Sequence, residues 1–290
     1  MRSERGLFLL LLPYAFGVVV LVALPAAITF GLALFEYDLV RAPDFRGLGN
    51  FRELAEDEVF RISLRNSLMF VAFAVPLRLL GALGLALLLH RRMRGAGAYR
   101  TGVYLPTVVP DVAYALLWLW IFNPLYGPLN LTLEALGLPS PEWLTDARDA
   151  QWAIVVMSVF ILGEGFLVAL AVRRSLPGEL YQLAELEAAS PFYVLRRLTL
   201  PLMAPALLLL LFRDTIFSFQ LNFVPALLVT EGGPPPYETT YLPLFVYRAG
   251  FEYLRYGYAA AATLTMFFVT ALIVFLQWRI VVRWRRSFAL

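Results

Sequence analysis

Six long apolar stretches run through this chain, and they limit what it can fold into. A helix needs about 20 apolar residues to cross the roughly 30 Å hydrocarbon core of a bilayer, and 60% of the 290 residues are hydrophobic. The mean hydropathy is +0.72, so the chain has far more apolar surface than the core of a soluble protein needs. The sequence therefore predicts an all-α membrane protein with spans at about 7–34, 67–89, 101–122, 152–172, 202–229 and 257–281.

The first stretch is long for a signal peptide and no small-residue cleavage site ends it, so we interpret it as a span. No low-complexity linker or internal repeat divides the chain, which predicts one membrane domain over residues 1–290. Several prolines, Pro76, Pro106, Pro110 and Pro225, fall inside spans, where we expect bent helices.

Arginine is distributed unevenly between the two predicted faces. With both ends inside, the inner segments hold 14 arginines and four acidic residues, whereas the outer segments 35–66, 123–151 and 230–256 hold 8 arginines and 14 acidic residues. Because basic flanking residues stay on the cytoplasmic side, both termini are predicted to be cytoplasmic. We therefore interpret the net charge of +3 as a consequence of the membrane topology, and we expect no nucleic-acid partner.

Five charged residues lie in the interior of the predicted spans, away from their ends: Arg78, Asp111, Glu164, Arg213 and Asp214. Each would cost about 2.5–3.5 kcal/mol at the centre of a lipid-facing helix. They could neutralise one another, for example Arg78 with Glu164 or Asp111 with Arg213. Alternatively, some line a pathway and bind a hydroxyl-rich or anionic solute, since the arginine fork suits a carboxylate or phosphate.

Enzyme chemistry has little support in the composition. Cysteine is absent, the one histidine is His90 at the inner end of the second span, and there is no Gly-rich phosphate loop. An aspartyl pair of Asp111 and Asp214 is the conceivable exception, but no motif accompanies it. We expect a protein that is not an enzyme and carries no metal or cofactor of its own.

Two outer segments have recognisable patterns. Segment 36–61 is amphipathic, and we interpret it as a cap on the outer face; its apolar members are Phe45, Leu48, Phe51, Leu54 and Phe60. Segment 123–151 opens with the turn-forming residues Asn123-Pro124 and Tyr126-Gly127-Pro128. A short helix is predicted to follow them over residues 129–136.

The inner segment 173–201 has the pattern of helix, break, helix. Apolar residues at intervals of three or four predict a first helix over residues 179–189. Ser190 is placed to cap a second short helix that starts at Pro191 and continues through Leu198. The apolar face of this hairpin packs either on the inner ends of the chain's own helices or in a groove of a soluble partner.

This loop resembles the signature of binding-protein-dependent ATP-binding cassette importer permeases, E-A-A-x-x-x-G followed by I-x-L-P. The matching positions are Gln182, Leu183, Ala184 and Ala188, then Leu198, Leu200 and Pro201; the flanks Leu176–Tyr181 and Glu187–Ser190 match as well. The resemblance implies contact with ATPase subunits through Glu179, Tyr181, Gln182, Leu183, Ala184, Glu187, Ala188, Ala189 and Ser190. Because glutamine replaces the leading glutamate, a salt bridge at that position is excluded.

The likeness extends along most of the chain and points to the sugar-type branch, similar to maltose and glycerol-3-phosphate permeases and to the first permease of the pair. It rests on an ordered set of short motifs: 45–51 (Phe-Arg-Gly-Leu-Gly-Asn-Phe), 99–106, 123–130, 143–144, 230–234, 247–252 and 257–261. The implied fold is that of a type I importer permease with six transmembrane helices.

The same resemblance implies a set of partners. They are a second homologous permease, two ATPase subunits that bind ATP and Mg, an extracytoplasmic solute-binding protein, and membrane lipid. The implied location is a bacterial or archaeal inner membrane. By likeness to sugar-type relatives, the pathway candidates are Glu164, Gly165, Thr215, Phe219 and Asn222.

We therefore expect an importer permease for a sugar or related polyol-like solute. An importer for a phosphorylated or acidic solute such as glycerol 3-phosphate, and a self-sufficient secondary transporter, are the alternatives.

Overall fold

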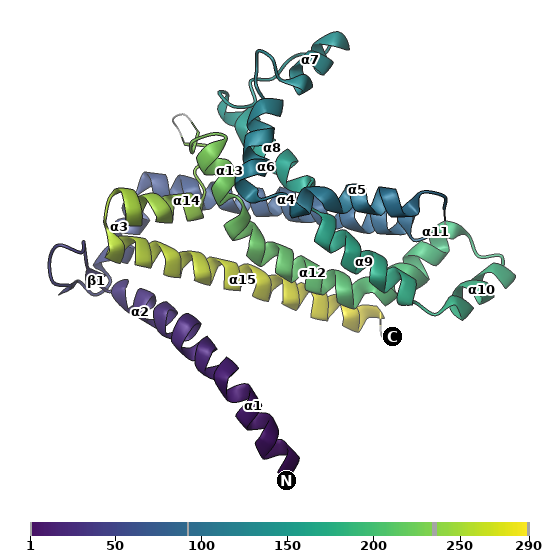
Figure 1. The fold of residues 1–290 in the computed structure, drawn as a ribbon, viewed down its shortest axis with the longest axis horizontal. Helices are drawn as coiled ribbons and strands as arrows, with labels where there is room; N and C mark the ends of the chain where they lie inside the picture. Colours follow the sequence, from purple (N-terminus) through teal and green to yellow (C-terminus); the bar gives the residue numbers. More distant parts are fainter. Residues whose placement is uncertain (1, 92, 234–236, 289–290) are drawn as a thin grey trace. The chain divides into compact units, whose positions relative to one another are not determined.

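A computed structural model describes residues 2–91, 93–233 and 237–288; Pro234, part of one motif above, lies outside this set. The described chain is mostly helical (Figure 1). It forms two compact units, described separately below. The first comprises Met1–Arg61 and Phe245–Val269, and the second Ile62–Leu244 and Thr270–Leu290. The single membrane domain expected from the sequence stays a prediction.

Among the described residues, four helical segments are long and apolar enough to cross a membrane, and two bent helix pairs bring the total to as many as six. The four are Leu10–Leu32, Glu58–Leu89, Pro191–Leu228 and Tyr256–Arg283; the bent pairs are Ala96–Val108 with Asp111–Ile121, and Arg148–Val159 with Gly163–Ser175. These six segments coincide with the six predicted spans, so the predicted all-α membrane fold is confirmed.

The third span is the one that departs most from a straight helix. Helix α5 (Ala96–Val108) and helix α6 (Asp111–Ile121) meet at 102°. Pro110 explains the break, because proline lacks an N–H and disfavours helical geometry at the preceding residue; Val109 is extended, with ψ 129°. By contrast, helix α4 (Glu58–Leu89) continues through Pro76.

The first unit begins with a long helical segment and a small hairpin. Its elements are α1 (Arg2–Val18), a π-helical turn (Val19–Ala23), α2 (Leu24–Leu32), β1 (Phe35–Glu36), β2 (Asp44–Phe45), α3 (Gly49–Glu56), a second π-helical turn (Arg248–Glu252) and the first part of α15 (Tyr256–Phe288). The strands pair antiparallel, Phe35 opposite Phe45. Buried Asn50 donates hydrogen bonds of 2.9 Å to the carbonyls of Ala33 and Phe35, which fixes α3 to the hairpin.

Only some of the apolar side chains of the outer cap predicted over segment 36–61 are buried. Leu54 and Phe60 are buried, but Phe45 and Leu48 are exposed. Polar contacts hold the cap to the start of α15: Arg255 pairs with Glu53 at 2.6 Å. Both an ion pair and the burial of Leu54 and Phe60 therefore hold the cap in place.

The second unit contains the remaining helices. They are most of α4, then α5, α6, α7 (Pro128–Ala135), α8 (Ala147–Val159), α9 (Gly163–Ser175), α10 (Gly178–Leu186), α11 (Pro191–Val194), a π-helical turn (Leu195–Thr199), α12 (Leu200–Leu221), α13 (Phe223–Leu228), the first half of α14 (Leu242–Tyr247) and the end of α15. Helix α9 packs against α5 and α12. Small residues of α4 and α9, such as Ala82, Ala86 and Ala169, lie in the apolar core, where they let helices approach closely.

Two buried asparagines have structural roles in this unit. Helix α7 confirms the short helix predicted over 129–136, and Asn130 in its first turn accepts a 2.8 Å hydrogen bond from the Trp143 indole. Asn66 of α4 donates to the carbonyls of Tyr237 and Thr240, at 3.0 and 3.1 Å. These buried amides attach connecting segments to the helices.

Candidate functional site

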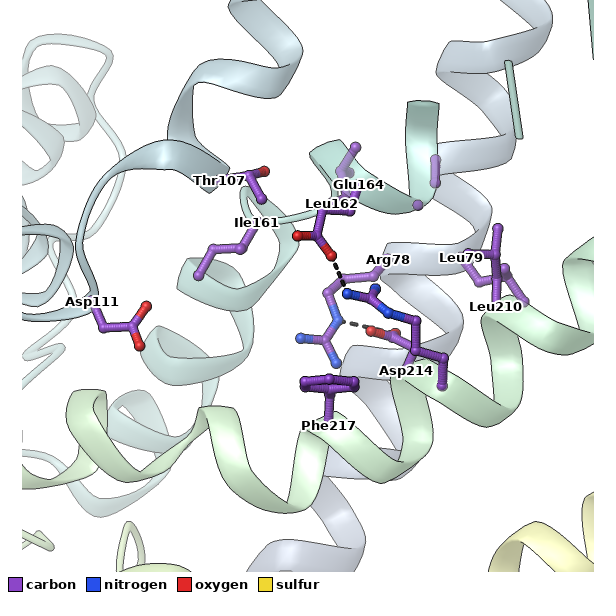
Figure 2. Close-up of a pocket in the computed structure, with 13 residues that line it drawn as sticks. Arg78, Leu79, Thr107, Asp111, Ile161, Leu162, Glu164, Leu210, Asp214 and Phe217 are labelled. Carbon is purple, nitrogen blue, oxygen red and sulfur yellow. Dashed lines mark hydrogen bonds and ion pairs between the residues drawn. The ribbon is translucent and has the colours of Figure 1, made fainter. Parts of the chain in front are cut away.

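A cavity of about 220 Å³ opens in the second unit, between helices of four predicted spans (Figure 2). Its walls come from α4, α5, α6, α9 and α12. The lining residues are Arg78, Leu79, Ala82, Thr107, Asp111, Ile161, Leu162, Glu164, Gly165, Leu210, Arg213, Asp214 and Phe217. All five ionisable residues singled out within the spans therefore line one cavity.

The first ion pair joins α4 to α12. Arg78 Nε lies 3.2 Å from Asp214 Oδ2, and the arginine side chain is only 4% exposed. The guanidinium also donates to the hydroxyl of Ser218, which itself donates to the backbone carbonyl of Asp214 at 2.6 Å. A buried charge needs such compensation, and here one carboxylate and one hydroxyl supply it.

The second ion pair joins α12 to α9. Arg213 donates to Glu164, and both side chains are half-exposed. The Arg213 guanidinium also lies over the Phe217 ring, 4.8 Å from its centroid. The pairings suggested from the sequence, Arg78 with Glu164 and Asp111 with Arg213, are wrong: the packing of α12 places adjacent residues 213 and 214 toward two different helices.

Asp111 is the fifth charged residue and stands apart from the two pairs (Figure 2). It is the first residue of α6, directly after the 102° break. Its side chain is exposed, and its carboxylate makes no ion pair or hydrogen bond with any residue that the structure describes. The break thus places an uncompensated carboxylate on the wall of the cavity.

The remaining pathway candidates occupy a different side of α12. Thr215, Phe219 and Asn222 are each at most 2% exposed, and none lines the cavity. Thr215 accepts a 2.9 Å hydrogen bond from Gln277 of α15. A helical repeat of 3.6 residues explains this result, because it places 210, 213, 214 and 217 on the cavity side and 215, 219 and 222 on another. Their pathway role stays a prediction, whereas Glu164 and Gly165 do line the cavity.

Sequence reasoning missed several lining residues. Phe217 could have been found, since it follows Asp214 by three residues on the same side of a helix. Thr107 and Ile161 carry no such signal, because they lie beside helix breaks whose geometry depends on packing. Within the described ranges, no three His, Cys, Asp or Glu residues lie close enough to hold a metal ion.

The inner loop forms the predicted hairpin, with different boundaries. Helix α10 ends at Leu186 rather than at residue 189, because Ala188 adopts a left-handed conformation with φ 49°. The Ala189 N–H then bonds the Ala184 carbonyl at 2.9 Å, which closes the helix end. Ala188 occupies the position where the resembled signature has glycine, the residue that adopts this conformation without a Cβ penalty.

The hairpin exposes apolar side chains and is anchored by polar ones. Leu183 and Leu186 of α10 are 57% and 83% exposed, whereas Tyr181 lies under the Arg173 guanidinium and hydrogen-bonds Thr199 at 3.1 Å. Ser190 accepts the predicted cap bond from the Tyr193 N–H. The second helix was predicted to end at Leu198, but it continues through a π-helical turn into α12.

Six apolar helical segments, a charge-lined cavity among them and an exposed amphipathic hairpin define a multi-pass membrane transport protein. Comparison with known proteins specifies it further: residues 83–286 match the family described as "Binding-protein-dependent transport system inner membrane component". The chain belongs to this family. It has the type I fold of ABC importer permeases and is the permease component of such an importer.

Several relatives align over most of their length. The probable ABC transporter permease protein YesP of Bacillus subtilis is 30% identical over 271 residues, covering 92% of this chain and 87% of that protein. The trehalose/maltose transport system permease protein MalF of Thermococcus litoralis is 30% identical, covering 92% and 90%. The sn-glycerol-3-phosphate transport system permease protein UgpA of Yersinia pestis is 31% identical, covering 83% and 81%.

Solved structures share the fold. A chain in the crystal structure of a bacterial alginate ABC transporter, in complex with alginate pentasaccharide-bound periplasmic protein, has a TM-score of 0.83 and 24% identity, covering 95% of this chain and 93% of that chain. A second structure, of a bacterial ABC transporter involved in import of the acidic polysaccharide alginate, has a TM-score of 0.84, also at 24% identity.

Proposed function

We propose that this chain forms half of the translocation pathway of an ATP-driven importer for a sugar or related polyol, and that the solute passes the cavity between α4, α6, α9 and α12. The observation that carries the proposal is that the five charged residues in the interior of the spans all line one cavity. Charged groups are retained in spans chiefly where they pair or face a water-filled path. The relatives' names support a sugar or polyol, since they include trehalose/maltose and glycerol-3-phosphate systems.

The coupling surface in this proposal is the inner hairpin, Gly178–Val194. Leu183, Leu186 and Phe192 of this hairpin stay largely exposed to solvent among the residues that the structure describes. An amphipathic helix of this kind suits a hydrophobic groove, which we assign to an ATPase subunit. Glu179, Gln182, Glu187 and the flanking Ser190 would form the polar rim of that contact.

The rest of the assembly follows the same proposal. A second, homologous permease completes the pathway, two ATPase subunits bind ATP and Mg, and an extracytoplasmic binding protein delivers solute. The arginine excess on one predicted face supports a cytoplasmic location for both termini and the hairpin, in a bacterial or archaeal cell. ATP hydrolysis then biases the pathway between inward-open and outward-open forms.

Two measurements test this function. Affinity purification of the tagged chain in mild detergent should recover an ATPase and a second permease. A chain that is recovered alone and moves solute in liposomes with only an ion gradient would be a secondary transporter.

The hairpin itself is tested by charge placement. Leu183→Glu should abolish ATP-driven uptake while the complex's spans stay folded, because it puts a charge in the apolar contact. Gln182→Glu is the matched control: it adds the same charge one residue away, where the resembled signature has glutamate, and should retain uptake. Normal uptake by Leu183→Glu would contradict the assignment of the coupling surface.

A further inference from the structure

The charges around the cavity do not balance. Two guanidinium groups, Arg78 and Arg213, face three carboxylates, Asp111, Glu164 and Asp214, which leaves one negative charge in excess. Between protein walls the effective dielectric is about 20, below that of bulk water, so one unbalanced charge acts on a charged solute more strongly than it would in water.

Neither arginine is free to take up an anion. Arg78 is buried and uses Nε on Asp214 and a terminal nitrogen on Ser218. Arg213 pairs with Glu164, and its guanidinium lies over the Phe217 ring. An anionic solute would have to displace a carboxylate from one of them and leave that carboxylate uncompensated in the same cavity.

The available group is Asp111. Its carboxylate is exposed, has no ion-pair or hydrogen-bond partner within the described part of the chain, and lies across the cavity from the two ion pairs (Figure 2). A carboxylate accepts hydrogen bonds from hydroxyl groups and more strongly from an ammonium group. The Thr107 hydroxyl, which belongs to another lining residue, is buried and also has no partner among the described residues.

We propose that this cavity selects against negatively charged solutes: it takes a hydroxyl-rich solute that is neutral or carries an amine, with Asp111 as the acceptor. The cavity, about 220 Å³, is smaller than the roughly 300–1,000 Å³ of sites for drug-sized ligands. It therefore fits one small polar unit of a solute. This inference rests on the proposed function and names the charge class of its solute.

The test uses three sugars of nearly equal size that differ in charge: glucosamine, glucose and glucuronate. Binding of each to the complete importer complex in lipid nanodiscs is measured by saturation-transfer NMR with titration. We expect glucosamine to bind best and glucuronate at least about tenfold more weakly than glucose, as one like charge in a low-dielectric site implies.

Variants of Asp111 assign the effect to this residue. Asp111→Asn should remove most of the difference among the three sugars, and Asp111→Glu should keep their order. Asp44→Asn is the control for the loss of one charge, because Asp44 is exposed and lies outside the cavity. It should leave the binding of all three sugars unchanged.

Each outcome decides the matter. Glucuronate binding as tightly as glucose, or an unchanged order in Asp111→Asn, would overturn the inference while the importer assignment stands. Binding of none of the three also overturns it. The proposed function fails separately, if no ATPase is recovered with the chain.

Discussion

The buried ion pair between Arg78 and Asp214 offers the sharpest test of how the second unit is held together. At 3.2 Å and an effective dielectric of about 20, the attraction between two unit charges is about 5 kcal/mol. The cost of removing both charges from water offsets much of this attraction, so the pair as a whole contributes little. Removing one partner, however, leaves the other buried and uncompensated, which costs about 3–5 kcal/mol.

The two single substitutions should differ. Asp214→Leu leaves the Arg78 guanidinium, 4% exposed, without its carboxylate and should lower the free energy of unfolding by about 3–5 kcal/mol. Arg78→Met leaves a carboxylate that is 21% exposed and next to Arg213, so its cost should be at the lower end of that range. The double variant Arg78→Met with Asp214→Leu replaces the pair by apolar groups and should be within about 1 kcal/mol of the original chain.

The assay is equilibrium unfolding of the purified chain in mixed detergent micelles, followed by circular dichroism. The four proteins form a double-mutant cycle, which isolates the interaction between the two residues. If the losses in the two single variants simply add in the double variant, the side chains do not interact as described and the reasoning is refuted.

Three further predictions concern the hairpin, the cap and the inner face. Ala188→Gly should stabilise the hairpin by about 0.5–1 kcal/mol, because glycine removes the Cβ penalty of a positive φ; protection of the α10 amides from hydrogen exchange measures this. Gly257→Ala should destabilise the first unit by about 1–3 kcal/mol, since the new Cβ would clash with the Phe35 carbonyl, as thermal unfolding would report. His90 should titrate below its ordinary pKa of 6.5, because burial and nearby arginines disfavour its charged form although its ring bonds the Leu87 carbonyl; NMR of this sole histidine gives the value.

Matched controls make these outcomes specific. Ala189→Gly, next to the left-handed residue, should not stabilise the hairpin, and an equal gain there would contradict the conformational explanation. Gly31→Ala, in open space on α2, should be neutral or favourable, unlike Gly257→Ala. For His90 the lowered pKa means that its contribution to stability is complete above pH 6.5 and is lost as the pH falls through the folded-state pKa. Stability that rises on acidification through this range would contradict it.

Local features of the sequence were sufficient to predict the spans and the hairpin. The lengths of the apolar stretches predict the membrane segments because each span must satisfy its own backbone hydrogen bonds within one helix. The hairpin could be predicted for a similar reason: Ser190 and Pro191 start a helix through contacts within four residues. Even so, the left-handed Ala188 was not expected, since alanine gives no signal for positive φ.

Only the tertiary structure decided which charges meet. Arg78 and Asp214 are 136 positions apart, and Arg213 and Glu164 are 49 apart, so their pairing depends on how α4, α9 and α12 rotate about their axes. A rotation of one residue, about 100° on a helix, would exchange the faces of α12 and bring Thr215 rather than Asp214 to the cavity. The sequence by itself determined that this chain crosses a membrane with charges inside its spans. Helix packing, through that rotation and the break at Pro110, decided which charges cancel and that Asp111 stands alone.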